Sequence, residues 1–152
     1  MIQETLFYGL GRVIRQMIQS AELGDHVYGL TRQSPLPDTI KAMATIQDWN
    51  VVKHIVFSLP PSAENYRQQF HQLIDQIPSH IHIHLLSTIG VFSDQQGVVH
   101  EQSQPKPTSS NGEIQYQLEQ HLMQAKNPYS IIRLAGLWGP DHLNQDFIRA
   151  RN

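Results

Sequence analysis

The sequence predicts an α/β domain of three layers around a mostly parallel sheet. Short apolar runs alternate with segments whose apolar residues recur at a helical period of about 3.6 residues. A glycine pair, Gly9 and Gly11, stands where the first apolar run gives way to the first helical segment, a context typical of strand–helix units. The chain has 152 residues, the length of one domain. We therefore predict a single domain over residues 1–152.

Three strands and two helices are predicted in the first half of the chain. Apolar and β-branched runs predict strands over 4–8, 26–31 and 51–57. The first helix is expected to end at Gly24, and a short helix to run from a cap at Asp38 to Ala44. The apolar stripe of the first helix consists of Val13, Ile14, Met17, Ile18 and Ala21.

The second half repeats the alternation. Strands are predicted over 80–86, followed by Ser87 and Thr88, and over 130–134. A polar stretch at 93–110 is expected to be a long loop, which is unusual unless it serves a site. Ser62 is expected to cap a helix whose apolar face consists of Tyr66, Phe70, Leu73, Ile74 and Ile77. The last helix is predicted from Ile114, Leu118, Leu122 and Ala125.

Composition excludes several functions. The 11 Lys and Arg residues are balanced by 13 Asp and Glu residues, so no basic field supports a nucleic-acid partner. The absence of cysteine excludes a disulfide, a thiolate metal site and a cysteine nucleophile. No apolar run approaches the roughly 20 residues that span a bilayer, so no membrane partner is expected. The acidic N-terminus is unlike a signal peptide, and we expect a cytoplasmic protein.

The segment from Gly9 through Leu10, Gly11, Arg12 and Val13 resembles the start of a G-x-G-x-x-G dinucleotide loop. The first glycine would permit a tight turn, and the second would let the backbone approach a pyrophosphate. The third glycine position holds Ile14, whose branched side chain is expected to push the helix away from the strand or redirect it. The alternative is an ordinary strand–helix turn that binds no nucleotide.

Two arginines bear on cofactor choice. Thr31 ends the second predicted strand and Arg32 follows it, where an acidic residue would bind the ribose 2′-hydroxyl of NAD. Together with Arg12 they suit a 2′-phosphate instead, which predicts NADP(H) in preference to NAD(H). The alternative is that both arginines are solvated surface residues.

Alternating histidines at 80, 82 and 84 raise the question of a metal. His80 and His84 would lie about 13 Å apart along a strand, too far for one tetrahedral ion, and no further ligand is suitably spaced. We predict no metal site and expect these histidines to pack beneath a helix. Ser87 and Thr88 lack a G-x-S-x-G elbow, which argues against a hydrolase.

Four segments, in this order, resemble the extended short-chain dehydrogenases/reductases, the nucleoside-sugar epimerase and dehydratase group, and most of all its atypical members. They are GLGR at 9–12, VFSLPPS at 56–62, LSTIGVF at 86–92 and RLAGLWGP at 133–140. The resemblance implies a Rossmann-type domain that binds NAD(P) and catalyses hydride transfer. It places Thr88 as the catalytic hydroxyl residue. It also adds to the expected cofactor site the loop after Arg133 and the residues Leu59, Pro60, Pro61 and Ser87.

The chain also departs from this family. Aligning Glu119 with the family's acidic residue puts Asn111 and Gln115 at the positions of the catalytic Tyr-x-x-x-Lys pair, and neither titrates near neutral pH. Tyr116 lies nearby but has Gln120 four residues on. The fold is expected to be reduced, without a C-terminal substrate subdomain, and to self-associate through its incomplete sheet edge. Two functions therefore remain open: an NADP-dependent epimerase-like or reductase-like enzyme, or an inactive nucleotide-binding or protein-interaction module. The module would be either a reduced relative of those enzymes or a fragment of a longer protein.

Overall fold

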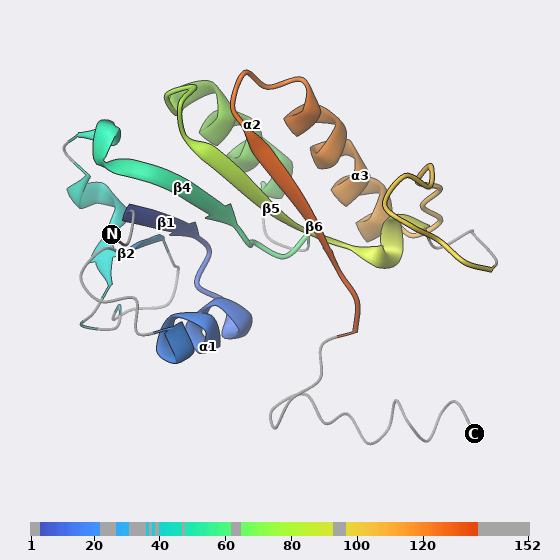
Figure 1. The fold of residues 1–152 in the computed structure, drawn as a ribbon, viewed down its shortest axis with the longest axis horizontal. Coiled ribbons are helices and arrows are strands. Elements are labelled where there is room, and N and C mark those ends of the chain that lie inside the picture. Colours follow the sequence, from blue (N-terminus) through green and yellow to red (C-terminus); the bar gives the residue numbers. More distant parts are fainter. Residues whose placement is uncertain are drawn as a thin grey trace.

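The structure is a computed structural model that describes residues 4–21, 27–30, 36, 38, 40–46, 48–61, 65–92 and 97–136. A six-stranded sheet runs through these residues in the order β3-β2-β1-β4-β5-β6 (Figure 1). Its strands are β1 (Glu4–Tyr8), β2 (Val27–Leu30), β3 (Lys41–Ala42), β4 (Val52–Phe57), β5 (His82–Thr88) and β6 (Tyr129–Leu134). The helices are α1 (Arg12–Ala21), α2 (Tyr66–Gln76) and α3 (Ser110–Met123). Short 3-10 turns are η2 (Met43–Thr45), η3 (Trp49–Val51) and η4 (Ile89–Phe92).

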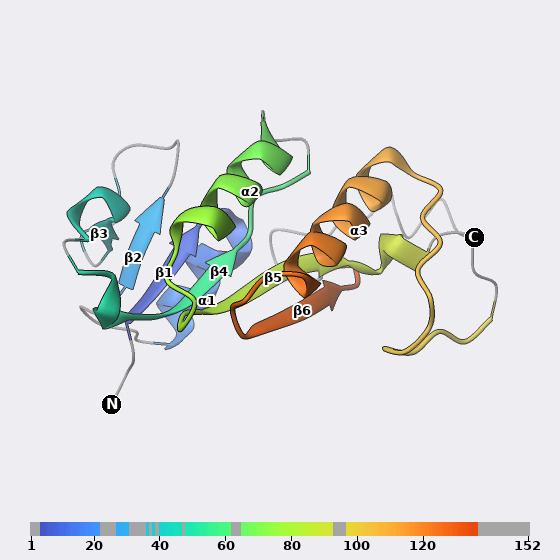
Figure 2. The ribbon, with the colours of Figure 1, turned by 90° about the horizontal axis from the view of Figure 1, so that it is seen from above.

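Every described strand pair is parallel. From β1 the chain builds outward to β2 and β3 on one side, and from β4 outward to β5 and β6 on the other, so the order reverses between β1 and β4. Helix α1 covers one face of the sheet, and α2 and α3 cover the other (Figures 1 and 2). The predicted three-layer α/β fold is therefore confirmed.

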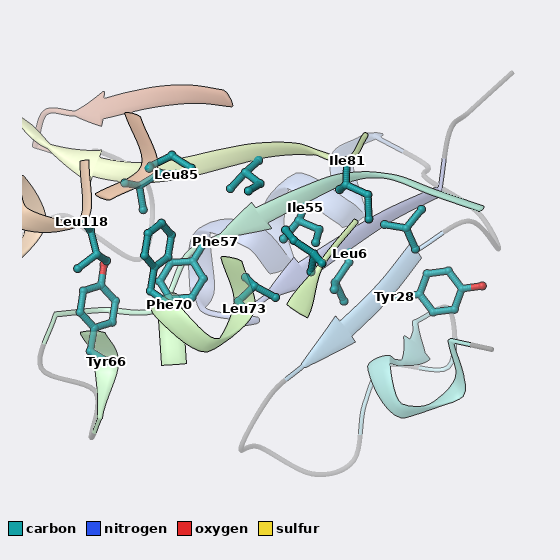
Figure 3. Packing of buried hydrophobic residues seen from close by; sticks show 14 residues of the cluster. Leu6, Tyr28, Ile55, Phe57, Tyr66, Phe70, Leu73, Ile81, Leu85 and Leu118 are labelled. Carbon is teal, nitrogen blue, oxygen red and sulfur yellow. The ribbon is translucent and has the colours of Figure 1, made fainter. Parts of the chain in front are cut away.

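The larger apolar core lies between the sheet and helices α2 and α3. Phe57 of β4 and Phe70 of α2 meet edge to face with ring centroids 4.8 Å apart, and both side chains are fully buried (Figure 3). Leu118 and Leu122 extend this cluster along α3. The helical stripe predicted for α2 is confirmed as core packing, because Tyr66, Phe70 and Leu73 are its buried residues.

The smaller core lies beneath α1. Ile14 is 1% exposed there and packs with residues of α1, β1 and β2, so this branched side chain fills the layer between helix and sheet. Leu10 is buried as well, because Gly29 has no side chain: a Cβ at Gly29 would lie 2.7 Å from Leu10 Cδ1. The other members of this cluster are Phe7, Ile18, Val27 and Ile40.

The prediction of a short helix from Asp38 to Ala44 is wrong. Lys41 and Ala42 instead form β3, which pairs with β2 at Tyr28 and Gly29 and leads into η2. Ile40 is buried in the smaller core, which holds this segment against the sheet. This third strand has only two residues.

Element ends differ from prediction by small amounts. Val51 belongs to η3, so β4 begins one residue later than predicted, and β5 begins at His82 rather than His80. β5 begins later because a turn precedes it, in which the backbone N–H of Ile81 donates to the carbonyl of Pro78 at 3.2 Å. Asn65 is the N-cap of α2. The predicted ends at Gly24 and Thr31 and the predicted cap at Ser62 lie outside the described residues.

Candidate functional site

The carboxyl ends of β1 and β4 lie side by side at the point where the strand order reverses. Tyr8 is in register with Phe57, so the segments after these strands meet at one edge of the sheet. In open parallel sheets a crevice at this point is where ligands bind. The structure therefore places Gly9 and Leu59, two predicted site residues, next to each other.

Gly9 has a backbone conformation that requires glycine. Its φ is +105°, and a Cβ there would lie 3.0 Å from Leu59 Cδ2. Hydrogen bonds hold the turn from both neighbouring strands: the N–H of Gly9 donates to Leu30 O at 3.0 Å, and Ser58 Oγ donates to Gly9 O at 2.6 Å. Ser58 was not among the predicted site residues, although it lies within the family-like segment 56–62.

Gly11 is exposed and leads directly into α1. A Cβ at this position would meet no described atom within 4 Å, so the space above the backbone is open. Helix α1 has no acidic residue in its first turn, and the free N–H groups of a helix N-terminus attract anions. Arg15 stabilises the turn, because its Nε donates to Leu10 O at 2.9 Å.

The remaining residues predicted around this loop have mixed positions. The side chain of Leu10 belongs to the smaller core, while Val13 and Pro61 are half-buried and Pro60 is exposed. The side chain of Arg12 lies outside the described part of the structure. The same holds for Thr31, Arg32 and the Trp138–Pro140 part of the loop after Arg133, so the basis for an NADP preference stays a prediction.

Thr88 and Ser87 project in opposite directions at the end of β5, as alternate strand residues do. Thr88 is half-buried, and its Oγ1 accepts the backbone N–H of Gly90 at 3.1 Å, which caps η4. Ser87 is 4% exposed, and its Oγ donates to Glu119 Oε1 at 2.6 Å. The Ser87 hydroxyl is thus engaged in the interior, and a role of Ser87 in cofactor binding stays a prediction.

A buried ion pair lies behind Ser87. Glu119 is fully buried, and Arg133 donates to it from two guanidinium nitrogens, Nε at 3.0 Å and Nη2 at 2.8 Å. The same guanidinium lies 4.8 Å from the ring centre of Phe92. The hydrogen bond to Glu119 raises the pKa of Arg133. Sequence reasoning did not predict this pair, because Glu119 lies beside the apolar stripe of α3 rather than within it.

The two positions aligned with the Tyr-x-x-x-Lys pair differ in environment. Asn111 is exposed, whereas Gln115 is 3% exposed. Gln115 accepts the O–H of Tyr66 at its Oε1 and donates from Nε2 to Leu86 O at 3.1 Å. Burial raises the pKa of Tyr66, so this phenol stays protonated. Neither position offers a group that exchanges protons near neutral pH.

The histidines form a cluster on the sheet face opposite α2 and α3. His80 is exposed in the turn before β5, but His82 and His84 stack with centroids 4.4 Å apart. His54 of β4 joins them, with its Nδ1 3.0 Å from Nε2 of His84. Burial, with the nearby His82 and His54, lowers the pKa of His84 to about 4. In the part of the chain described by the structure, no group of three or more His, Cys, Asp or Glu residues is suited to hold a metal ion.

The parallel sheet, its reversal between β1 and β4, and the glycine turn at that reversal define a Rossmann-like α/β domain. No family model and no curated sequence matches the chain. Among the described residues, none of the helices is long and apolar enough to cross a membrane.

Comparison with solved structures identifies the same fold in several larger proteins. A protein from Methylobacillus flagellatus, assigned as an NAD-dependent epimerase/dehydratase, has a TM-score of 0.70 and 20% identity, over 99% of this chain and 59% of its own. MoeE5 in complex with UDP-glucuronic acid and NAD has a TM-score of 0.65 and 15% identity, over 97% and 59%.

A third similar structure is the UDP-glucuronic acid 4-epimerase from Bacillus cereus, in complex with UDP-glucuronic acid and NAD. Its TM-score is 0.61 at 16% identity, over 85% of this chain and 55% of the epimerase. The chain thus spans little more than half the length of the proteins it resembles. At these identities the likeness shows the fold, and the expectation of a Rossmann-like fold is confirmed.

Proposed function

We propose that this domain binds a nicotinamide dinucleotide at the carboxyl edge of β1 and β4. The observation that carries the proposal is the turn at Gly9 and Gly11: a left-handed glycine fixed by Ser58, followed by an exposed glycine at the start of α1. A pyrophosphate needs this combination, because its oxygens must approach both backbone and helix N-terminus. Two of the similar structures contain NAD.

Within this proposal, Thr31 and Arg32 favour NADP(H) over NAD(H) by residue type. Thr88 and Leu59, with Pro60 and Pro61 beside it, would lie along the bound dinucleotide. We also place the protein in the cytoplasm, because its sequence contains no cysteine and no apolar run of the length that spans a bilayer. None of these assignments depends on the part of the epimerases that this chain does not match.

Titration with NADPH and NADH, followed by protein fluorescence and melting temperature, tests the binding site. We expect a saturable shift that is larger with NADPH. Gly11→Val should abolish it, because the branched side chain would occupy the space over the backbone, where a Cβ meets no described atom within 4 Å. Met17→Val, on the exposed face of the same helix, is the matched control and should bind normally. No shift with either dinucleotide at millimolar concentration would refute the proposal.

Cofactor preference has its own test. Arg32→Ala should weaken NADPH binding at least tenfold and leave NADH binding within twofold, because only NADPH carries the 2′-phosphate. An equal loss for both dinucleotides would contradict a role for Arg32 in choosing between them.

We further propose that binding occurs without catalysis of the epimerase type. Gln115 stands at the lysine position and is held by Tyr66 and the Leu86 carbonyl, so it cannot lower the pKa of a catalytic phenol. Incubation with NAD and UDP-glucuronic acid should therefore yield neither NADH absorbance nor an epimerised sugar. Turnover of that sugar by the purified chain would restore the alternative, an active epimerase-like enzyme.

A further inference from the structure

Helices α2 and α3 lie side by side on one face of the sheet, and side chains join them along an outer seam (Figures 1 and 2). Arg67 Nη1 of α2 donates to Gln117 Oε1 of α3 at 2.9 Å. About one turn further along each helix, the rings of His71 and His121 stack, with centroids 3.9 Å apart and planes inclined by 3°. A hollow of about 410 Å³ follows this seam, lined by these four residues and by Gln68, Gln120 and Gln124.

His121 is half-buried, and its ring nitrogen Nε2 is buried without a hydrogen-bond partner among the described residues. Its ring also meets Phe70 of the core edge to face, with centroids 6.2 Å apart. A neutral imidazole can carry its proton on Nδ1 and leave only a lone pair at Nε2, whereas an imidazolium has N–H groups at both nitrogens. A buried N–H without an acceptor costs free energy. The charged form of His121 therefore needs water at Nε2, which requires the seam to open.

The neighbouring side chains of α2 carry opposite charges. Arg67 lies one turn before His71, and Asp75 lies one turn after it. Partial burial lowers the pKa of His71 most, and the nearby His121 lowers it further, while Asp75 raises it and Arg67 lowers it. The stacked pair thus binds protons less readily than separated rings do, and a fall in pH favours separation.

The carboxylates of α3 are already engaged. Glu119 is buried and paired with Arg133, and Glu113 accepts a hydrogen bond from a glutamine of the same helix. Lys126, just after α3, lines a second hollow together with His121 and adds a positive charge near it. The sheet face beneath both helices contributes apolar side chains to the core. The surroundings therefore offer little to offset a second positive charge on the pair.

The stacked geometry also argues against a metal ion bound by both rings. The lone pair of an imidazole nitrogen lies in the plane of its ring, and the two planes here are nearly parallel. Parallel rings cannot direct their lone pairs to one ion. Proton uptake is the chemistry that remains for these two side chains.

We propose that His71 and His121 form a pH-sensitive latch between α2 and α3. While both rings are neutral, they stack and close the seam. When both are protonated, two positive rings with centroids 3.9 Å apart repel each other, and the rings separate as water reaches Nε2 of His121. Phe70 and Leu118 remain in the core beneath, so the helices stay on the sheet and only the seam between them opens.

Amide hydrogen exchange of the full chain at pH 7 and pH 5 tests this proposal. Protection factors correct for the intrinsic pH dependence of exchange, and they are compared between α2 and β1. Strand β1 lies within the sheet and contains no histidine, so it reports loosening of the whole domain. We expect the ratio of protection in α2 to protection in β1 to fall by about fivefold or more at pH 5. A ratio that is the same at both pH values would overturn the proposal.

Two substitutions separate protonation from packing. His121→Phe keeps a flat ring for His71 to stack on but cannot take up a proton, so the ratio should change by less than about twofold. His71→Phe makes the same change at the exposed ring and should act alike. His80→Phe, at an exposed histidine outside the pair, is the matched control and should keep the native pH effect. A native pH effect that survives in both His121→Phe and His71→Phe, or one that His80→Phe also removes, would overturn the latch.

Discussion

Replacing Glu119 by glutamine removes the negative charge from the interior beneath α3 while keeping the shape of the side chain. In the native protein this carboxylate is fully buried and accepts three hydrogen bonds, two from Arg133 and one from Ser87. The amide of glutamine can still accept from Ser87, but its NH₂ group would face the guanidinium. The variant thus leaves Arg133 without its ion-pair partner, although its Nη1 still donates to Glu101 O at 3.4 Å.

Breaking a buried ion pair by removing one partner costs about 3–5 kcal/mol. Arg133 keeps 17% of its side chain exposed, so water can replace part of the lost interaction. We therefore expect Glu119→Gln to lower the free energy of unfolding by about 2–3 kcal/mol. In the Glu119→Gln background, Arg133→Met should cost less than about 1 kcal/mol, because the pair is already broken.

Urea unfolding followed by circular dichroism at pH 7 measures these differences. Glu113→Gln is the matched control: it makes the same substitution on the same helix at an exposed carboxylate, which accepts a hydrogen bond from Gln117 at 3.0 Å. Its effect should stay within about 0.5 kcal/mol. If Glu119→Gln is no more destabilising than Glu113→Gln, the buried pair does not hold α3 to the sheet.

Three further substitutions test other contacts. Gly112→Ala should destabilise by about 1–3 kcal/mol in urea unfolding, because its Cβ would lie 2.7 Å from Gly90 O; Gly11→Ala, which meets open space, should not. Tyr66→Phe leaves the buried amide oxygen of Gln115 without its donor and should cost about 1–3 kcal/mol, whereas Tyr129→Phe on the surface should cost little. The pKa of His84 is lowered from 6.5 to about 4, so the unfolded chain takes up this proton first and stability falls as pH drops from about 7 to 4. If the whole pKa difference of His84 acted on folding, the free energy of unfolding would fall by about 3 kcal/mol over this range, and partial exposure of the ring reduces the expected loss to about 1–2 kcal/mol. Melting curves of His84→Gln that keep the same pH dependence as the native protein would contradict this.

Local patterns in the sequence predicted most of the fold. The 4–8 strand was predicted to the residue, and the stripe of α2 was predicted correctly, because apolar periodicity directly reflects which face is buried. In α1 the predicted stripe is correct at Ile14 and Ile18, which are buried, and wrong at Met17, which is 47% exposed. The strand that follows Ile40 was not predicted, because a strand of two residues is too short to show a periodic pattern. Its conformation depends on pairing with β2 and on burial of Ile40, which only the folded chain supplies.

The candidate site was predicted in part. Spacing alone identified Gly9 and Gly11, since glycine in a strand–helix turn has a local conformational cause. The bonds that fix the site join distant positions: Ser58 with Gly9 across 49 residues, and Ser87 with Glu119 across 32. A single sequence contains no record of such pairings. The cluster of His54 with His82 and His84 was missed for the same reason, because His54 comes from the neighbouring strand.

The reversal of strand order also has a consequence for how this chain folds. β1 and β4 form the one strand pairing, among those described, that joins the first half of the sheet to the second. Each other pairing links strands that succeed one another along the chain, whereas this one must close a long loop and carries the larger entropic cost. We expect the two halves to form first and to join late. Because Ser58 reaches Gly9 across that junction, the glycine turn acquires its final shape in the last step of folding.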